Sequence, residues 1–365
     1  MANIMVNEAC NLRCPYCFAE EFVNKAPREM SIENFKTALN FVLRDMTNRQ
    51  VGIIGGEPLL YTHIDQAMRI ALSDPRTEHV MIYTNAVDLD RLAPDIQEAV
   101  KFRMLVNCNS PEDMGERAFD KMCENLLRFQ DEHCGDGRFR LSVNIYKPDF
   151  DYSYVIPLVQ EFGFDIIRMS ISVPQKGDLK GKSPLDYFQE MKLVSMRFVC
   201  DMIRCGVMTG FDCNFMPPCV LTDEERESMQ SAKDVLYSGL SKSYPETFWQ
   251  RAIISELHNC APVIDILPDL SAIRCFGLSE QTKLDIRNFS GIEELEKYYV
   301  MKVDLPLVGK WTSEKCATCE SRQFAECSGG CLLFKMQAGD GVERRIFMDA
   351  QAGMPPTGRF SVRAE

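Results

Sequence analysis

The sequence lacks the features that would place it in a membrane or outside the cell. Among its 365 residues, no apolar run approaches the roughly eighteen residues that a membrane-spanning helix needs. The first residues contain no basic stretch and no signal-type apolar segment, so they do not indicate export. We therefore expect a globular, cytoplasmic protein without a membrane partner.

The sequence is also short of positive charge and of histidine. It has 41 Lys and Arg residues against 53 Asp and Glu residues, a formal net charge of −12 at pH 7. A surface of that sign repels a phosphate backbone unless a local patch reverses it, so nucleic acid is not an expected partner. The 4 histidines are scattered, without ligand-like neighbours. Cysteine, in contrast, is abundant.

The 16 cysteines are better explained by metal or cluster ligation than by disulfides, because the cytoplasm keeps thiols reduced. They form one organised group near the N-terminus and another in the C-terminal half. Between the groups lie five without a pattern, which we interpret as small buried hydrophobic side chains: Cys108, Cys123, Cys134, Cys200 and Cys205. For Cys108, at a predicted strand end, a hydrogen-donor role is the alternative.

Up to about residue 175, short apolar runs alternate with longer amphipathic stretches, as in repeated βα units around a parallel sheet. The absence of a glycine-rich nucleotide fingerprint after the first strand favours an incomplete barrel over a doubly wound sheet. We therefore predict an α/β fold with a partial (β/α)6 barrel. The predicted strands are Ile4–Val6, Val51–Ile54, His79–Tyr83, Arg103–Val106, Arg140–Ile145 and Ile166–Ile171. The predicted helices between them are Ser31–Thr47, Ile64–Ser73, Asp90–Lys101, Gly115–His133 and Tyr152–Phe162.

Four segments follow from these patterns. The barrel occupies residues 1–175, and a helical bridge with a predicted helix over Pro184–Ile203 occupies 176–210. A small cysteine-rich domain, organised by metal sites more than by a core, occupies 211–349. Residues 350–365 form a C-terminal tail without periodicity.

The N-terminal cysteines lie in the loop Cys10-Asn-Leu-Arg-Cys14-Pro-Tyr-Cys17, directly after the first predicted strand. Three thiolates this close together can hold three irons of a cubane cluster and leave the fourth iron open to a substrate or cofactor. A structural zinc site is the alternative, but it needs a fourth ligand. The spacing therefore favours a [4Fe–4S] cluster with one open iron.

Further polar motifs follow the next strands. In Gly55-Gly56-Glu57-Pro58, two glycines let the backbone approach a ligand and the carboxylate can receive an ammonium group. Thr84 and Asn85 end the third strand, and Asn107-Cys-Asn-Ser110 ends the fourth, where barrel enzymes keep their sites. Ordinary turns and strand-end caps are the alternative for each motif.

The cysteine loop and the Gly55–Pro58 segment resemble the motifs of the radical S-adenosylmethionine (SAM) superfamily. The resemblance implies a [4Fe–4S] cluster at Cys10, Cys14 and Cys17 whose open iron is chelated by SAM. It implies cleavage of SAM to methionine and a 5′-deoxyadenosyl radical, which abstracts hydrogen from a substrate. The SAM contacts that it implies are Tyr16, Gly55, Gly56, Glu57, Pro58, Thr84, Asn85, Asn107, Ser110 and Asn144.

The C-terminal cysteines resemble a SPASM domain, the auxiliary-cluster module of radical enzymes that mature peptides and proteins. Three departures from that pattern stand out: seven residues instead of five separate Cys319 from Cys327, Leu270 replaces a glycine, and no cysteine follows Cys331. Eight cysteines nevertheless match the number that two four-cysteine clusters need. They are Cys213, Cys219, Cys260, Cys275, Cys316, Cys319, Cys327 and Cys331.

By analogy with that domain, one auxiliary cluster is an inner one and the other an outer one. The inner set is Cys260, Cys275 and Cys331 with one of Cys213 and Cys219; the outer set is Cys316, Cys319 and Cys327. The fourth outer ligand is left open between the other upstream cysteine and a carboxylate such as Asp349. A zinc ribbon of Cys316, Cys319, Cys327 and Cys331 is the alternative.

The resemblance thus implies a radical SAM maturase of a peptide or protein side chain, reduced by a partner such as flavodoxin or ferredoxin. Two other functions remain open. One is radical chemistry on a small metabolite, and the other is a non-catalytic iron–sulfur scaffold or electron carrier, which would not need the Gly55–Pro58 segment.

Overall fold

The computed structural model describes residues 2–45, 49–133, 137–173, 182–211, 216–227, 263–307, 310–320, 327 and 329–338. Within them, a 10-stranded sheet has the order β10-β9-β8-β1-β2-β3-β4-β5-β6-β7. The strands are β1 (Ala2–Met5), β2 (Gln50–Ile54), β3 (His79–Thr84), β4 (Phe102–Asn107), β5 (Phe139–Ile145), β6 (Ile166–Ile171), β7 (Met208–Phe211), β8 (Ile264–Ile266), β9 (Ser271–Ile273) and β10 (Leu284–Asp285). The α-helices are α1 (Ile32–Val42), α2 (Ile64–Ser73), α3 (Pro94–Gln97), α4 (Pro111–Met114), α5 (Glu116–His133), α6 (Val155–Phe162), α7 (Pro184–Arg204), α10 (Ser279–Thr282), α11 (Ile292–Tyr299), α12 (Leu305–Leu307) and α14 (Leu332–Ala338).

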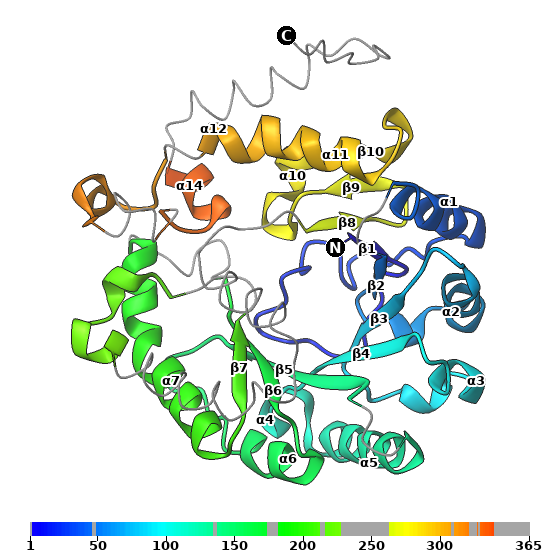
Figure 1. The fold of residues 1–365 in the computed structure, drawn as a ribbon, viewed down its shortest axis with the longest axis horizontal. Helices are drawn as coiled ribbons and strands as arrows, with labels where there is room; N and C mark the ends of the chain where they lie inside the picture. Colours follow the sequence, from blue (N-terminus) through cyan, green and yellow to red (C-terminus); the bar gives the residue numbers. More distant parts are fainter. Residues whose placement is uncertain are drawn as a thin grey trace.

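Strands β1 to β7 are parallel, and each lies beside the next one along the chain. Strands β1 to β6 confirm the six predicted strands, with ends shifted by at most two residues. The helices of this half lie on the outer side of the curved sheet (Figure 1). The predicted α/β fold with a partial barrel is therefore present, and the carboxyl ends of its parallel strands share one edge.

The sheet extends beyond the six predicted strands on both sides. Strand β7 pairs in parallel with β6. On the other side β8 pairs in parallel with β1, and β9 and β10 follow as antiparallel strands (Figure 1). The predicted cysteine-rich segment thus adds three strands to the barrel sheet, next to the N-terminal strand. The segment limits at 175, 210 and 349 stay predictions.

Side chains alternate along the barrel strands. On β4, Phe102, Met104 and Val106 are buried, while Arg103 and Asn107 are only half-buried. Because successive side chains of a strand point to opposite faces, the half-buried ones face the barrel interior. The hydrophobic core therefore lies between the sheet and the helices.

Proline and glycine explain where helices differ from those predicted. The predicted helix Asp90–Lys101 is wrong, because Pro94 holds Ala93 in an extended conformation and splits the segment into a 3-10 turn at Leu89–Arg91 and the short α3. Gly115, with a φ of 85°, separates α4 from α5. The predicted helices that correspond to α2 and α7 are confirmed.

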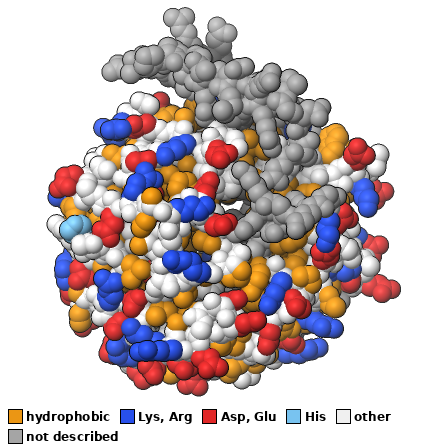
Figure 2. Space-filling view, turned by 180° about the vertical axis from the view of Figure 1, so that it is seen from behind, with side chains coloured by type: hydrophobic (Ala, Val, Ile, Leu, Met, Phe, Trp, Pro, Cys, Tyr) orange, Lys and Arg blue, Asp and Glu red, His pale blue; other side chains and the backbone are white. Residues whose placement is uncertain are grey.

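The surface carries charges of both signs. The face in Figure 2 mixes Lys and Arg with Asp and Glu side chains over the described residues. In the described part of the chain, no helix is both long and apolar enough to cross a membrane.

Candidate functional site

The N-terminal cysteine loop follows β1. Asn24 fixes its start, because the Cys10 N–H donates to the Asn24 side-chain oxygen over 2.9 Å. A tight turn joins the other two cysteines, since the Cys17 N–H donates to the Cys14 carbonyl over 3.2 Å. All three thiols are partly buried and close enough to influence one another's ionisation. The structure thus brings Cys10, Cys14 and Cys17 together.

Burial sets the ionisation of these thiols. It raises the pKa of Cys10 to about 12 and that of Cys14 to about 11, and it also raises the pKa of Cys17. At Cys10 a hydrogen bond from the Leu12 N–H opposes the shift, whereas the Glu57 carboxylate adds to it. The thiols therefore stay neutral at pH 7 until a cation replaces their protons. An iron–sulfur cluster fits this donor set, because soft sulfur ligands select such clusters.

Gly55 and Gly56 pack against the start of the cysteine loop. The Gly56 N–H donates to the Asn7 carbonyl over 3.0 Å, and the Glu57 N–H donates to the Ala9 carbonyl over 2.7 Å. A Cβ atom on Gly56 would lie 2.4 Å from the Ala9 oxygen, and one on Gly55 would lie 2.1 Å from the Asn7 side-chain oxygen. Glycine is needed here so that two segments of backbone can touch, whereas the motif alone suggests contact with a ligand.

Glu57 is 1% exposed, and its carboxylate accepts three hydrogen bonds from the protein. The donors are the Thr84 hydroxyl at 2.6 Å, the Asn85 N–H at 2.8 Å and the Leu59 N–H at 3.1 Å. Burial raises the pKa of Glu57 to about 7, although these bonds oppose the shift. The Asn85 side chain also donates to Asn11 of the cysteine loop over 2.7 Å. We call Glu57, Thr84 and Asn85 the brace, because they are hydrogen-bonded to one another and Asn85 is hydrogen-bonded to the cysteine loop.

A line of hydrogen bonds crosses the ends of β6, β5 and β4. The Ser170 hydroxyl donates to the Asn144 side-chain oxygen, and the Asn144 amide donates to Asn107 over 2.6 Å. The Asn107 amide in turn donates to the Tyr16 hydroxyl over 3.2 Å. We call these four residues the polar arc. The predicted residues Asn107 and Asn144 are thus direct neighbours at one edge of the barrel.

Tyr16 joins the polar arc to the cysteine loop. Its hydroxyl donates to Asn109, and the Asn109 amide donates to the Cys14 sulfur over 3.2 Å. The Tyr16 ring packs on Tyr146, with 5.2 Å between the ring centroids, and the Tyr146 hydroxyl donates to Asp113 over 2.7 Å. Asn109 belongs to the predicted polar motif at the end of β4. Sequence reasoning did not single out Ser170 and Tyr146, which lie at the carboxyl ends of β6 and β5, or Asp113, which lies in α4.

Three residues near the site have structural roles. The Ser110 hydroxyl caps α4 by accepting from the Asp113 N–H over 3.1 Å. Pro58 begins the 3-10 turn η1 (Pro58–Leu60). Cys108 is 1% exposed and packs in the hydrophobic core, which confirms the prediction of a small buried side chain.

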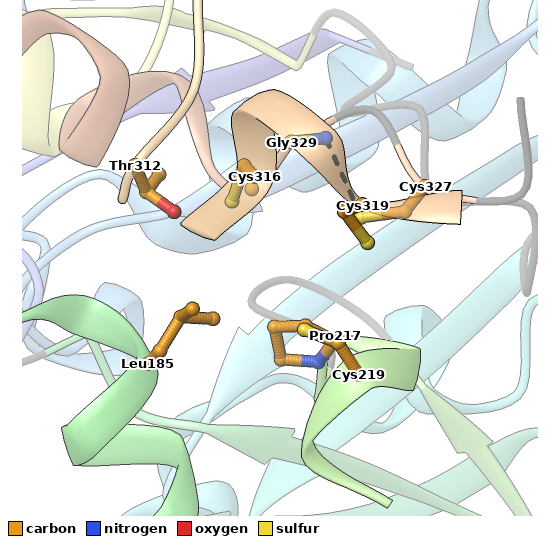
Figure 3. A pocket seen from close by; sticks show the side chains of 9 residues that line it. Leu185, Pro217, Cys219, Thr312, Cys316, Cys319, Cys327 and Gly329 are labelled. Atoms are coloured by element: carbon orange, nitrogen blue, oxygen red, sulfur yellow. Dashed lines mark hydrogen bonds between the residues drawn. The ribbon is translucent and has the colours of Figure 1, made fainter. Parts of the chain in front are cut away.

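A second group of cysteines lines a pocket on the C-terminal side. Cys316 and Cys319 lie in and just after the 3-10 helix η7 (Glu314–Thr318), with Cys327 beside them. Cys219, from the 3-10 turn η3 (Pro218–Val220), lies on the opposite side of this pocket (Figure 3). The rest of the lining consists of Leu185, Pro217, Thr312, Gly329 and Gly330.

The other predicted auxiliary ligands are not among the residues that line this pocket. Cys275 follows β9, Cys331 precedes α14, and both pack against the hydrophobic core. Cys213, Cys260 and Asp349 lie outside the described residues. The inner ligand set therefore stays a prediction.

The barrel is similar in sequence to known proteins. Residues 4–146 match the model of the Radical SAM superfamily. The chain is 40% identical over 96 residues to a GTP 3′,8-cyclase of Chlorobaculum tepidum, and 30% identical over 173 residues to one of Microcystis aeruginosa. These matches cover 26% and 47% of this chain. They span only 28% and 46% of the length of those relatives.

Solved structures share the fold over most of the chain. One is anSMEcpe with bound AdoMet and the Cp18Cys peptide, with a TM-score of 0.58, 15% identity and coverage of 96% of both chains. Another is Streptococcus suis SuiB bound to S-adenosylmethionine, with a TM-score of 0.56, 16% identity and coverage of 91% of this chain and 72% of that one. At such identities the likeness concerns the fold alone. It extends beyond the barrel into the C-terminal cysteine-rich region.

Proposed function

We propose that this chain, whose N-terminal domain belongs to the radical SAM superfamily, cleaves SAM reductively and removes a hydrogen atom from a peptide or protein side chain. The observation that carries the proposal is the position of Cys10, Cys14 and Cys17 at the substrate edge of a parallel barrel, between the brace and the polar arc. A [4Fe–4S] cluster held there supplies, through its open iron, the electron for SAM cleavage.

The chain's own residues bind and orient SAM in this proposal. Asn107 and Asn144 offer amide groups to its ribose and carboxylate, and the Tyr16 ring lies near its adenine. The Gly55–Pro58 segment contacts the SAM amino group through its backbone, because the Glu57 carboxylate is already occupied by three donors within the protein. Thr84, Asn85 and Ser110 support these contacts from the strand ends.

A peptide substrate is supported by the fold likeness over nearly the whole chain to anSMEcpe and SuiB, both solved with bound peptides. The C-terminal cysteines support it too, since they suit the auxiliary clusters of SPASM-type maturases. The proposal includes two such clusters, a flavodoxin or ferredoxin as reductant, and a cytoplasmic location.

A small-molecule substrate is the second candidate. The similarity to GTP 3′,8-cyclases in the barrel, 40% over 96 residues, favours it. Because those matches leave more than half of each relative uncovered, the peptide remains our preferred substrate.

The enzymatic proposal is tested by anaerobic reconstitution with iron and sulfide, followed by dithionite and SAM. We expect 5′-deoxyadenosine, detected by mass spectrometry. Intact SAM on protein with a full iron load would instead indicate a non-catalytic scaffold. Adding either GTP or a short peptide encoded beside this gene then separates the two substrate classes: a mass change in the peptide supports the maturase, and conversion of GTP supports the alternative.

A further inference from the structure

We propose that Cys219, Cys316, Cys319 and Cys327 are the four ligands of one auxiliary [4Fe–4S] cluster, the outer one. Its fourth ligand then comes from the segment that follows the barrel, not from a cysteine or carboxylate near the C-terminus. The assignment rests on the proposed function only in treating the C-terminal cysteines as cluster ligands.

The backbone around Cys219 presents its side chain to the pocket. The 3-10 turn η3 is closed by hydrogen bonds from Val220 N–H to the Pro217 carbonyl over 3.0 Å and from Leu221 N–H to the Pro218 carbonyl over 3.1 Å. Val220 is buried and anchors the turn, whereas Cys219 is exposed and lies at the pocket. The turn therefore offers a thiol that no core packing requires.

The three downstream cysteines come to the same pocket from two short segments. The Cys319 N–H donates to the Cys316 carbonyl over 3.4 Å, which closes a CxxC turn. The Gly329 N–H donates to the Cys327 sulfur over 3.4 Å, as backbone amides do around ligating thiolates. Gly330, at a φ of 103°, allows its segment to approach Thr312, since a Cβ atom there would lie 2.6 Å from the Thr312 methyl carbon.

The four thiols share one pocket. Cys219 lies on one side of it, and Cys316, Cys319 and Cys327 lie on the other (Figure 3).

The set of cysteines that line the pocket also favours an iron–sulfur cluster over a zinc ribbon. The zinc alternative requires Cys331, which is not among the residues that line the pocket. Four thiols spread around a pocket suit a cluster of several irons.

The test uses the full chain with Cys10, Cys14 and Cys17 replaced by Ala, so that only auxiliary iron remains. In this background, Cys219→Ala should lower the iron content by up to about four irons per chain, and it should change or abolish the electron paramagnetic resonance signal of one reduced cluster, because the three thiolates that remain leave one iron without a protein ligand. Cys316→Ala should cause the same loss. The double variant should lose no more iron than either single one, because both changes remove the same cluster.

Cys205→Ala is the matched control, since Cys205 caps α7 and does not line the pocket. It should keep the iron and both signals, and gel filtration and circular dichroism should show that all variants fold. Unchanged iron and spectra in Cys219→Ala would overturn the assignment. Loss of the remaining iron in the double variant would also overturn it. So would one zinc ion per chain in the variant that lacks only Cys10, Cys14 and Cys17. Failure of the unmodified chain to cleave SAM would overturn only the proposed function, because these readouts do not depend on cleavage.

Discussion

At the scale of single residues, Glu57 makes contacts that its sequence motif does not predict. The sequence around it predicts a cofactor contact, but its partners Thr84 and Asn85 are far along the chain. Only the parallel pairing of β2 with β3 brings them together. The cysteine loop could be predicted because its three cysteines lie within eight residues of sequence. The contacts of Glu57 with Thr84 and Asn85 could not be predicted, since they depend on strand register.

Glu57→Ala is expected to weaken SAM binding by about 1.5–3 kcal/mol, the range for a charge-assisted hydrogen bond. The change removes the acceptor of three buried hydrogen bonds and loosens the support behind the cysteine loop. Titration of the reconstituted protein with SAM measures the effect, which corresponds to roughly 10- to 150-fold in Kd. Glu29→Ala, at an exposed residue, is the control and should leave binding unchanged. An unaltered Kd in Glu57→Ala would contradict the role of the brace.

The joint replacement of Cys10, Cys14 and Cys17 by Ala should abolish SAM cleavage and leave auxiliary iron in place. The reason is that the three thiols share one loop, separate from the pocket around Cys219. Measuring 5′-deoxyadenosine and iron on the same sample checks both parts of the prediction. Cleavage that persists in this variant would show that the open-iron site lies elsewhere.

At the scale of elements, hydrophobic periodicity sufficed for β1 to β6 but not for the strands that flank them. Strand β8 has only three residues, with the carboxylate of Asp265 in the middle. That carboxylate is buried beside Asn3 of β1, whose amide donates to it over 2.8 Å. In the sequence, so short a strand with an acidic residue at its centre looks like a loop. Its partner strand β1 lies at the other end of the sequence, so no nearby pattern indicates the pairing.

Asp265→Asn is expected to stabilise the protein at pH 7.5 by about 1–3 kcal/mol. Burial raises the pKa of Asp265 to about 6, although Asn3 and Arg274 oppose the shift. Because this pKa lies above the usual value of 3.8, stability falls as pH rises between the two values and remains lowered at pH 7.5. A new amide removes the charge and can donate to the Asn3 side-chain oxygen, which is buried without a partner.

Thermal unfolding at pH 7.5 measures this change, with Asp269→Asn as the contrasting variant. Partial burial opposes ionisation of Asp269, but hydrogen bonds from Ser271 and Lys283 prevail and hold its pKa below the usual range. Its charged form is therefore favoured by folding, and its replacement should lower the midpoint. A lower midpoint in both variants would refute the reasoning for Asp265.

At the scale of the whole molecule, ligand counting predicts about twelve irons per chain, four from each of three clusters. Metal analysis after anaerobic reconstitution checks this number, and the variant without the N-terminal cysteines should retain about eight. About four residual irons with stoichiometric zinc would refute the auxiliary sites of SPASM type. The prediction depends on Cys219, because this cysteine lies at the pocket of Cys316, Cys319 and Cys327 and is proposed as their fourth partner.

The position of β1 between β2 and β8 has a consequence for the order in which the nascent chain folds. β2 emerges from the ribosome soon after β1, but roughly 200 further residues must be translated before β8, which takes about 10–40 s at five to twenty residues per second. During that time one edge of the N-terminal strand has no β8 to pair with. Such an edge can recruit strands from other polypeptides, so chaperone capture during translation should protect the yield of this protein.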